Sequence, residues 1–570
     1  MTVRTTVAEV LACFDGEFAE VAAAFARGEY LLWLGSGISR GVVPGVPKLL
    51  TQMLEFLRAN VEVSDPGCRF KKALEEVLDV AGVPAATRAL VDATKPVDEW
   101  RELDDIVGRL VDKYSDVLDV QVQGEAEDFL VWTGLDVPRT YGAPELAPDV
   151  EHLCVALLML EGVVRSAPTT NWDGLVEAAI DRIAEDPTGV LNVIVQAVDF
   201  RQPDRQSELV KFHGCAVRAL ANEDEYRPLL IARRSQISGW TARTENQFMK
   251  NRLEHLFGSR PAFIVGLSAQ DANIHTMLHE ASRDLARAWP TSPPAVVFAE
   301  QQLHYHHRHV MKATYGDTYA ANADEISESA LLGAYAQPTL LALVLFTLAD
   351  KLCALVGCVP DWALPIGEID RVRSGIRALR DALGGVADGD PRSFVDGVVS
   401  GAALMLSVFR SGRAPNSADV RYQPISNTPI TTALAGPDFP GSALGRLAVA
   451  VSLLGRGVGE GSWSLEVGTA AHPSEGVMRV VTGPQVSRVF VVRDARAFTQ
   501  LEVDGVVDPD DEGILVLQAE AARRPTTRAP RARYGRTGSG GVRHVDLEGL
   551  CATVSMADEL FEAFRLEGAL

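Results

Sequence analysis

Three short polar segments follow apolar runs and hold side chains that can bind and activate a ligand. They are Gly35-Ser36-Gly37-Ile38-Ser39, Thr170-Asn171-Trp172-Asp173 and Phe212-His213-Gly214. Glycines let backbone N–H groups approach a diphosphate closely, and an imidazole titrates near neutrality, which suits a general base. Each segment also has a structural interpretation, because glycine turns, Asn or Asp helix caps and buried histidines are common. Only their combination favours a ligand site.

The surrounding pattern predicts an α/β fold that places these segments at one sheet edge. A helical pattern over residues 8–27 precedes the apolar run at 30–34, and another helix is expected over 44–59. Strand-like runs return at 162–167, 190–198, 209–212, 262–267 and 295–298. Alternating strands and helices predict a Rossmann-like parallel sheet, and such sheets bind ligands at the carboxyl ends of their strands.

The chain is long enough for more than one domain. We expect a catalytic domain over 1–322, with a helical insertion at about 60–161, because helical patterns replace strands there. Long apolar helices at 339–359, 393–410 and 442–454 predict a helical region over 323–460. β-branched alternation and a last helix predict a β-rich module over 461–570. The expected C-terminal half is therefore an α+β domain.

Composition limits the partners and the compartment. A formal net charge of -22 repels phosphate backbones, so nucleic acid is expected mainly through a partner protein. Seven scattered cysteines without a Cys-x-x-Cys pair favour a reducing, cytoplasmic compartment and argue against a structural zinc site. No signal peptide is recognised, and Asp350 and Lys351 interrupt the apolar run over 338–359. A buried helix is expected there, and no membrane contact.

Four segments in order resemble the sirtuin family. They are the three segments above, with Lys211 before the third, and Phe263-Ile-Val-Gly-Leu-Ser-Ala-Gln-Asp-Ala-Asn-Ile274. More narrowly, they resemble sirtuin-like effectors of bacterial antiphage defence, over roughly residues 15–315.

The resemblance implies a role for each matching residue in the binding and cleavage of NAD⁺, as substrate. Asn171 would hold the nicotinamide ribose or the attacking water, and His213 would act as the base. Asp173 would bind the carboxamide, and Asp271 would brace the loop after its strand. The remaining implied contacts to NAD⁺ are Gly35, Ser36, Gly37, Ser39, Thr170, Gly266 and Ser268.

Two departures from the deacetylating sirtuins favour NAD⁺ hydrolysis. Their four-cysteine zinc module is absent, since only Cys215 follows His213 closely. In those sirtuins the glycine loop continues into Gly-Ile-Pro-x-Phe-Arg, whereas this chain has Pro44-Gly-Val-Pro-Lys48 in that place. The expected function is therefore an NAD⁺ hydrolase that releases nicotinamide and ADP-ribose as an antiphage effector. An ADP-ribosyltransferase, a deacylase and a non-catalytic NAD⁺ or ADP-ribose sensor remain as alternatives.

The resemblance also implies control by assembly, through a homo-oligomer and a protein partner. A HerA-type ATPase is favoured over a short Argonaute, because residues 325–460 have helical patterns.

Two further segments have an unusual composition and lie outside the four resembling segments. His304, His306, His307 and His309 have mixed spacing, which favours a solvated or pocket-rim segment over a metal site. Arg523 to Arg543 holds seven arginines and no acidic residue, which indicates a flexible basic loop.

Overall fold

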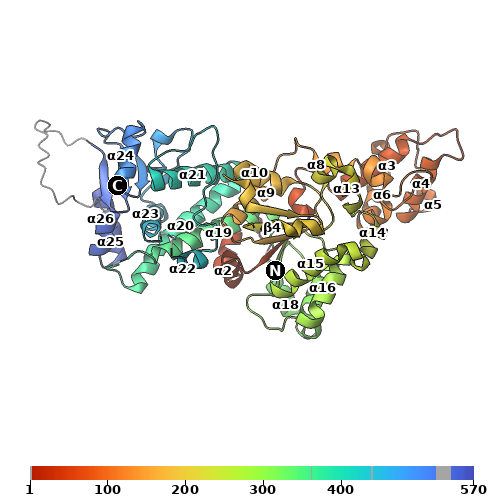
Figure 1. The fold of residues 1–570 in the computed structure, drawn as a ribbon, viewed down its shortest axis with the longest axis horizontal. Helices are drawn as coiled ribbons and strands as arrows, with labels where there is room; N and C mark the ends of the chain where they lie inside the picture. The colour runs from red at the N-terminus through yellow and green to blue at the C-terminus, as the bar shows by residue number, and fades with distance from the viewer. Residues whose placement is uncertain (1–2, 204, 361, 438, 440, 521–540) are drawn as a thin grey trace, which may run out of the picture.

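A computed structural model describes residues 3–203, 205–360, 362–437, 439, 441–520 and 541–570. The molecule is elongated, with the first sheet near the middle, most of the helical insertion at one end and the C-terminal sheet at the other (Figure 1). The predicted basic loop falls almost entirely on 521–540, outside the described residues.

The first sheet is the predicted Rossmann-like parallel sheet. Its strands are β1 (Leu31–Leu34), β2 (Ser166–Thr169), β3 (Leu191–Ile194), β4 (Ser207–Lys211), β5 (Ala262–Val265) and β6 (Val296–Ala299). Their order is β3-β4-β2-β1-β5-β6, and every neighbouring pair is parallel. After β1 the chain adds β2, β3 and β4 on one side of that strand, and then β5 and β6 on the other side. A topological switch point, where such sheets bind ligands, therefore lies between β1 and β5.

Apolar layers cover both faces of this sheet, which explains why β1, β5 and β6 are continuous apolar runs. Leu32 and Leu34 belong to the core on one face, and Leu31 and Trp33 to the core on the other. The first core includes residues of α1 (Val7–Asp15), α2 (Ala19–Ala26), α9 (Val150–Leu160), α10 (Leu175–Ile183) and α19 (Ala336–Val356). The second includes residues of α15 (Gln247–Ser259), α16 (Ala272–Leu285) and α17 (Tyr305–Tyr315).

The segment between β1 and β2 is helical, as predicted. It contains α3 (Val46–Ala59), α4 (Arg69–Val80), α5 (Ala85–Arg88), α6 (Leu103–Leu110), α7 (Tyr114–Val117), α8 (Val137–Gly142) and α9. Most of these helices share a separate apolar core, whereas α9 packs on the sheet. The expected strand over 162–167 begins later, at Ser166, because Gly162 turns the chain at a φ of 72° directly after α9.

The C-terminal half combines long helices with a second, mixed sheet, as predicted. The helices are α19, α20 (Ile366–Gly389), α21 (Pro391–Ser411), α22 (Ile430–Ala435) and α23 (Gly441–Gly459). The sheet joins β7 (Ser464–Val467), β8 (Met478–Thr482), β9 (Gln485–Val492), β10 (Ile514–Gln518) and β11 (Arg543–Asp546), in the order β11-β10-β9-β8-β7. The remaining helices there are α24 (Ala495–Val503), α25 (Leu547–Thr553) and α26 (Ala557–Gly568).

Helix α20 is the main element that the sequence analysis did not predict. Its glycines weaken the helical signal, but they allow close packing against α23. A Cβ atom on Gly375 would lie 2.1 Å from the carbonyl oxygen of Ser452, and one on Gly455 would lie 2.2 Å from that of Gly375.

Two helices are long and apolar enough to span a membrane by length and composition alone. In α19, 67% of the most apolar window is buried inside the protein, and in α21 the share is 50%. Core helices of soluble proteins pass the same test, so the two helices are weak evidence for membrane insertion.

Candidate active site

The predicted site residues follow four strands at the carboxyl edge of the first sheet. Gly35 follows β1, Asn171 follows β2, His213 follows β4 and Gly266 follows β5. The register pairs Thr169 of β2 with Lys211 of β4. Asn171 and His213 each lie two residues beyond this pair, so adjacent strands deliver both residues to the same edge.

The glycine loops after β1 and β5 pack against each other through their backbones. Gly35 N–H donates to the Val265 carbonyl and Gly37 N–H to the Gly266 carbonyl, both at 2.9 Å. A Cβ atom on Gly35 would lie 2.3 Å from the Gly266 oxygen, so a side chain is excluded there. These two amides are engaged with the neighbouring loop, and the expectation that they bind a diphosphate stays a prediction.

Ser39 is the centre of a buried hydrogen-bond chain. It ends the short 3-10 helix Ser36–Ser39, and its side chain is fully buried. Asp149 N–H donates to His152 Nδ1 at 3.2 Å, so the proton of a neutral His152 lies on Nε2, 3.1 Å from Ser39 Oγ. Ser39 Oγ–H in turn donates to Asp173 Oδ2 at 3.0 Å. The hydroxyl thus holds a histidine and a carboxylate together.

Burial lowers the pKa of His152, against the opposing effects of Asp173 and Asp149. His152 is therefore neutral at physiological pH, as this hydrogen-bond pattern requires. The same chain fixes Asp173, whose Oδ1 also accepts from Leu175 N–H at 3.2 Å.

Lys211 supports the backbone beneath Asp173. Its ammonium donates to the Asp173 carbonyl and to Glu177 Oε1, the latter at 2.9 Å. Burial alone would lower the pKa of Lys211, but the Glu177 carboxylate holds that pKa above its ordinary value. A charged lysine thus positions the segment between Asn171 and α10.

Asn171 has a side chain that is held at one end and unpaired at the other. Its Nδ2 donates to the Gly35 carbonyl at 3.2 Å and lies 3.5 Å from Ser39 Oγ. Its Oδ1 is buried and has no hydrogen-bond partner among the described residues. Buried polar atoms are normally paired, so this oxygen is the natural acceptor for a water molecule or a hydroxyl of a bound ligand.

His213 is buried among polar partners from the loop after β5. Asn273 Nδ2 donates to His213 Nε2 at 2.8 Å, and Ile274 N–H fixes the orientation of that amide by donating to Asn273 Oδ1. The proton of a neutral His213 therefore lies on Nδ1, 4.0 Å from Asp271 Oδ2. Burial lowers the pKa of His213, while Asp271 and Asn273 oppose this shift.

Asp271 also joins the helical insertion to the site. Tyr114 Oη donates to Asp271 Oδ1 at 3.0 Å, and Gln270 Nε2 donates to Asp112 Oδ1 at 3.2 Å. The insertion and the loop after β5 therefore meet beside His213.

The other predicted residues differ in exposure. Ser36 and Ser268 are exposed and can reach a ligand, and Thr170 is half-buried. Gly266 adopts a φ of 66°, in the left-handed region that favours glycine.

Three residues at this edge were missed by the sequence analysis: His152, Tyr114 and Asn273. The first two lie in the insertion, where no spacing links them to the site. Asn273 lies within the resembling segment but was given no role. Within the segment that the sequence analysis gave as solvated or pocket-rim, His304 and His309 are exposed, whereas His307 is buried. The His307 Nε2 atom contacts the Leu267 carbonyl at 2.9 Å, and its ring packs on Phe298. Burial lowers its pKa to about 4.

The histidine-rich segment also approaches α16. The rings of His306 and His309 each lie 5.7 Å from that of His275. Within the described ranges, no group of three or more His, Cys, Asp or Glu residues is arranged to hold a metal ion.

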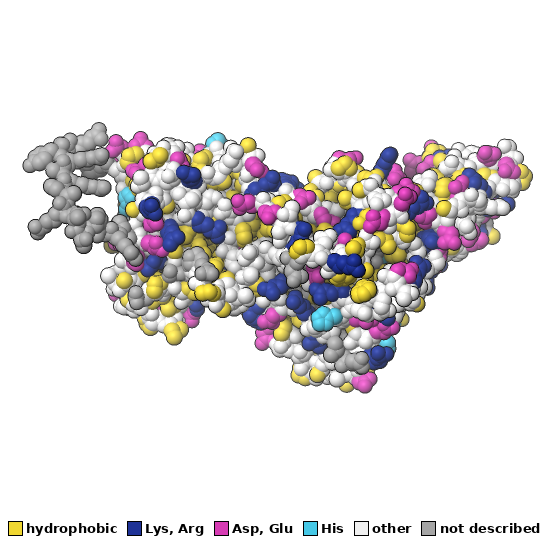
Figure 2. Space-filling model, viewed as in Figure 1, with side chains coloured by type: hydrophobic (Ala, Val, Ile, Leu, Met, Phe, Trp, Pro, Cys, Tyr) yellow, Lys and Arg dark blue, Asp and Glu magenta, His cyan; other side chains and the backbone are white. Residues whose placement is uncertain are grey.

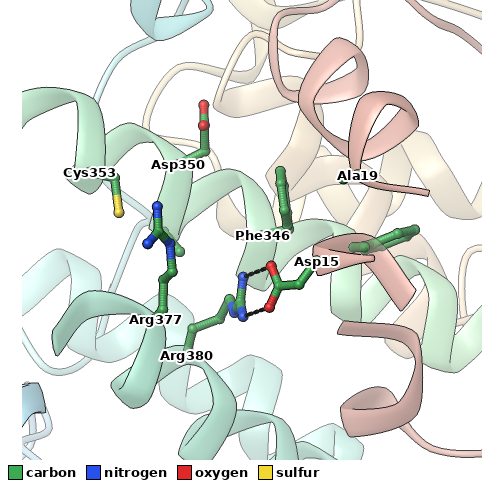
Figure 3. Close-up of a pocket in the computed structure, with 9 residues that line it drawn as sticks. Asp15, Ala19, Phe346, Asp350, Cys353, Arg377 and Arg380 are labelled. Carbon is green, nitrogen blue, oxygen red and sulfur yellow. Dashed lines mark hydrogen bonds and ion pairs between the residues drawn. The ribbon is translucent and has the colours of Figure 1, made fainter. Parts of the chain in front are cut away.

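A cavity of about 470 Å³ lies away from this edge, between α1, α2, α19 and α20. Phe14 and Phe346 line its apolar side, and Arg380 pairs with Asp15 at its border (Figure 3). None of the predicted site residues lines it, so it is distinct from the candidate active site.

One comparison with known proteins supports a sirtuin-like fold. Residues 165–319 match the family model described as SIR2-like domain, and this range includes Asn171, Asp173, His213 and Gly266. No curated protein matches the chain. The match omits β1 and its glycine loop, which the structure places beside the matched strands. SIR2-like domains bind NAD⁺ and belong to NAD-dependent enzymes, so the match supports a sirtuin-like fold for this part of the chain and suggests an activity related to NAD⁺.

Proposed function

We propose that the chain hydrolyses NAD⁺ to nicotinamide and ADP-ribose at the edge that carries Asn171 and His213. The main support is the unpaired, buried Oδ1 of Asn171, which lies beside the glycine loops and one strand from His213. A polar acceptor in this position fits a ribose hydroxyl or a water molecule. NAD⁺ offers the first, and hydrolysis requires the second.

The reaction breaks the bond between the ribose C1′ atom and the nicotinamide nitrogen. Nicotinamide leaves as a neutral molecule, water oxygen forms the new bond to C1′, and one water proton is released. Asn171 Oδ1 orients the water or the hydroxyl next to the reacting carbon, and such positioning lowers the barrier by reducing the entropic cost.

His213 accepts the proton. Its lowered pKa keeps the imidazole neutral at physiological pH, as a base must be. Because Asn273 occupies Nε2 in this structure, the proton donor must displace that amide before it can reach the nitrogen. Asp271, near Nδ1, stabilises the imidazolium that results.

The biological role follows from the danger of this reaction to its own cell. We propose an antiphage effector that depletes NAD⁺ in the cytoplasm once a partner or homo-oligomeric assembly activates it. A HerA-type ATPase is the preferred partner and a short Argonaute the second. Nucleic acid would be sensed through that partner, because the chain itself carries a net charge of -22.

Purified protein incubated with NAD⁺ tests the reaction, with nicotinamide followed by chromatography in the presence and absence of candidate partners. Asn171→Ala and His213→Ala should each lower the rate by at least about a hundredfold. His279→Ala is the matched control, since His279 is an exposed residue of α16.

Each alternative function has its own outcome in this assay. A rate that depends on an added peptide favours a transferase or deacylase. Binding of NAD⁺ without turnover under every condition identifies a sensor. Unchanged rates in both site variants would refute the assignment of Asn171 and His213.

A further inference from the structure

A cluster of three arginines lies at the amino edge of the first sheet, opposite the candidate active site. Arg165 directly precedes β2, Arg260 lies two residues before β5, and Arg252 is on α15. Arg252 pairs with Glu208 Oε1 of β4 at 2.5 Å, and Ser166 Oγ donates to the same oxygen at 2.7 Å. Figure 2 shows several Lys and Arg side chains gathered near the middle of one face, in the region of α15.

The fold explains why these side chains converge. Strand register pairs Ser166 with Glu208, and Glu208 N–H donates to the Arg165 carbonyl at 2.9 Å. Side chains alternate along a strand, so Glu208 lies on the same sheet face as Val210, which packs in the core beneath α15. Arg252 reaches Glu208 from that helix, and Arg260 follows the end of the same helix.

The positive charge of this cluster is not balanced. Three guanidinium groups are accompanied by one carboxylate, that of Glu208. Within the described part of the chain, neither Arg165 nor Arg260 forms an ion pair. Burial and the charges of Arg165 and Arg252 lower the pKa of Arg260, against the opposing effect of Glu208.

Two nitrogens in the cluster also lack hydrogen bonds. Nε of Arg252 and Nη1 of Arg260 are buried without a partner among the described residues. Buried guanidinium N–H groups normally have acceptors, and leaving them unpaired next to like charge is costly. An anion bound among these side chains would accept hydrogen bonds from the unpaired nitrogens and would offset the positive charge.

We propose that Arg165, Arg252 and Arg260 form a binding site for a doubly charged oxyanion, either free phosphate or the phosphate group of a monoester. Three cations and one carboxylate leave two positive charges, which matches a dianion. Guanidinium groups donate paired hydrogen bonds to phosphate oxygens, and this favours phosphate over a spherical anion. The site is independent of the proposed NAD⁺ hydrolysis, because it lies at the opposite edge of the sheet.

Isothermal titration of the full chain tests the site, with sodium phosphate and glycerol phosphate as probes at constant ionic strength. Saturable binding is expected, and Arg260→Gln and Arg165→Gln should each weaken it on the order of tenfold or more. Arg101→Gln, at an exposed position of the helical insertion, is the matched control and should bind as the unchanged protein does.

A variant that should strengthen binding distinguishes the loss of the site from misfolding, because a misfolded protein would only lose affinity for phosphate. Glu208→Gln removes the one carboxylate, so it should bind phosphate more tightly. Binding of phosphate alone supports the free ion as ligand, and tighter binding of glycerol phosphate supports a monoester. No saturable binding of either probe would overturn the proposal. So would equal binding by Arg260→Gln, Arg165→Gln and Arg101→Gln.

Discussion

Two serines in one loop provide the sharpest test of how the candidate site is built. Ser39 is fully buried between His152 and Asp173, whereas Ser36, three residues earlier, is exposed. The family resemblance implies that both contact NAD⁺. The structure separates them, because the Ser39 hydroxyl is already engaged by protein groups and Ser36 faces solvent.

Replacing Ser39 with alanine leaves two buried groups without partners. His152 Nε2–H loses its acceptor, and Asp173 Oδ2 loses its donor. An unsatisfied buried group costs about 1–3 kcal/mol, so with two such groups Ser39→Ala should lower the free energy of unfolding by about 2–6 kcal/mol. Ser36→Ala removes no such contact and should change it by about 0.5 kcal/mol or less.

The same pair predicts different kinetics for nicotinamide release. Ser39→Ala should lower kcat with a small effect on KM, because Asp173 and Asn171 lose their fixed positions. Ser36→Ala should instead raise KM, because it would remove the contact to NAD⁺ that the resemblance implies for this exposed serine. Urea unfolding and steady-state assays measure both effects. Equal stability of the two variants, or a Ser39→Ala defect confined to KM, would refute the positioning role.

Two more predictions concern buried charge. Because burial lowers the pKa of His213, with Asp271 opposing, nicotinamide release should retain its basic group below pH 6.5, the ordinary pKa of histidine. Between pH 6.5 and the lower pKa of His213 in the folded protein, this imidazole takes up a proton in the unfolded chain but not in the folded one. The free energy of unfolding should therefore fall as the pH decreases through this range. A pH–rate profile with its acid limb above 6.5 would contradict this. Glu161→Gln should cost about 3–5 kcal/mol by removing the carboxylate that neutralises the buried Lys351 ammonium, whereas Glu460→Gln, in an exposed pair, should cost about 1 kcal/mol or less in urea unfolding.

Local patterns predicted the sheet best at β1, β5 and β6, which are short apolar runs that end at polar loops, and less well at β2, whose residues are Ser-Ala-Pro-Thr. The order of those strands could not be predicted in the same way. It depends on long-range pairing, such as that of Leu31 with Ala262, which sequence spacing does not encode. Helix α20 was missed because its glycines serve contact with α23, a tertiary requirement that lowers the local helical signal.

The candidate site was predictable where a motif marks it and unpredictable where the insertion contributes. Asn171 and His213 lie in segments of recognisable type directly after strands. His152 and Tyr114 come from helices far away in the chain, and only folding brings them to Ser39 and Asp271. Gly35 and Gly37 show another limit of prediction from sequence. Their lack of a side chain was predicted to serve the binding of a diphosphate, but in the structure it permits the loop after β1 to pack against the loop after β5.

Helix α9 connects this site to the C-terminal half of the chain. His152 lies in its first turn and contacts Ser39, while Glu161 directly follows its last residue. Lys351 of α19 donates to the carboxylate and carbonyl of Glu161, and to the Ser426 and Thr428 carbonyls. The side chains of Glu161 and Lys351 are both buried, so separating the two charges would cost about 3–5 kcal/mol. A force that displaces α19 must therefore break this pair or move α9, and with it the histidine that holds Ser39.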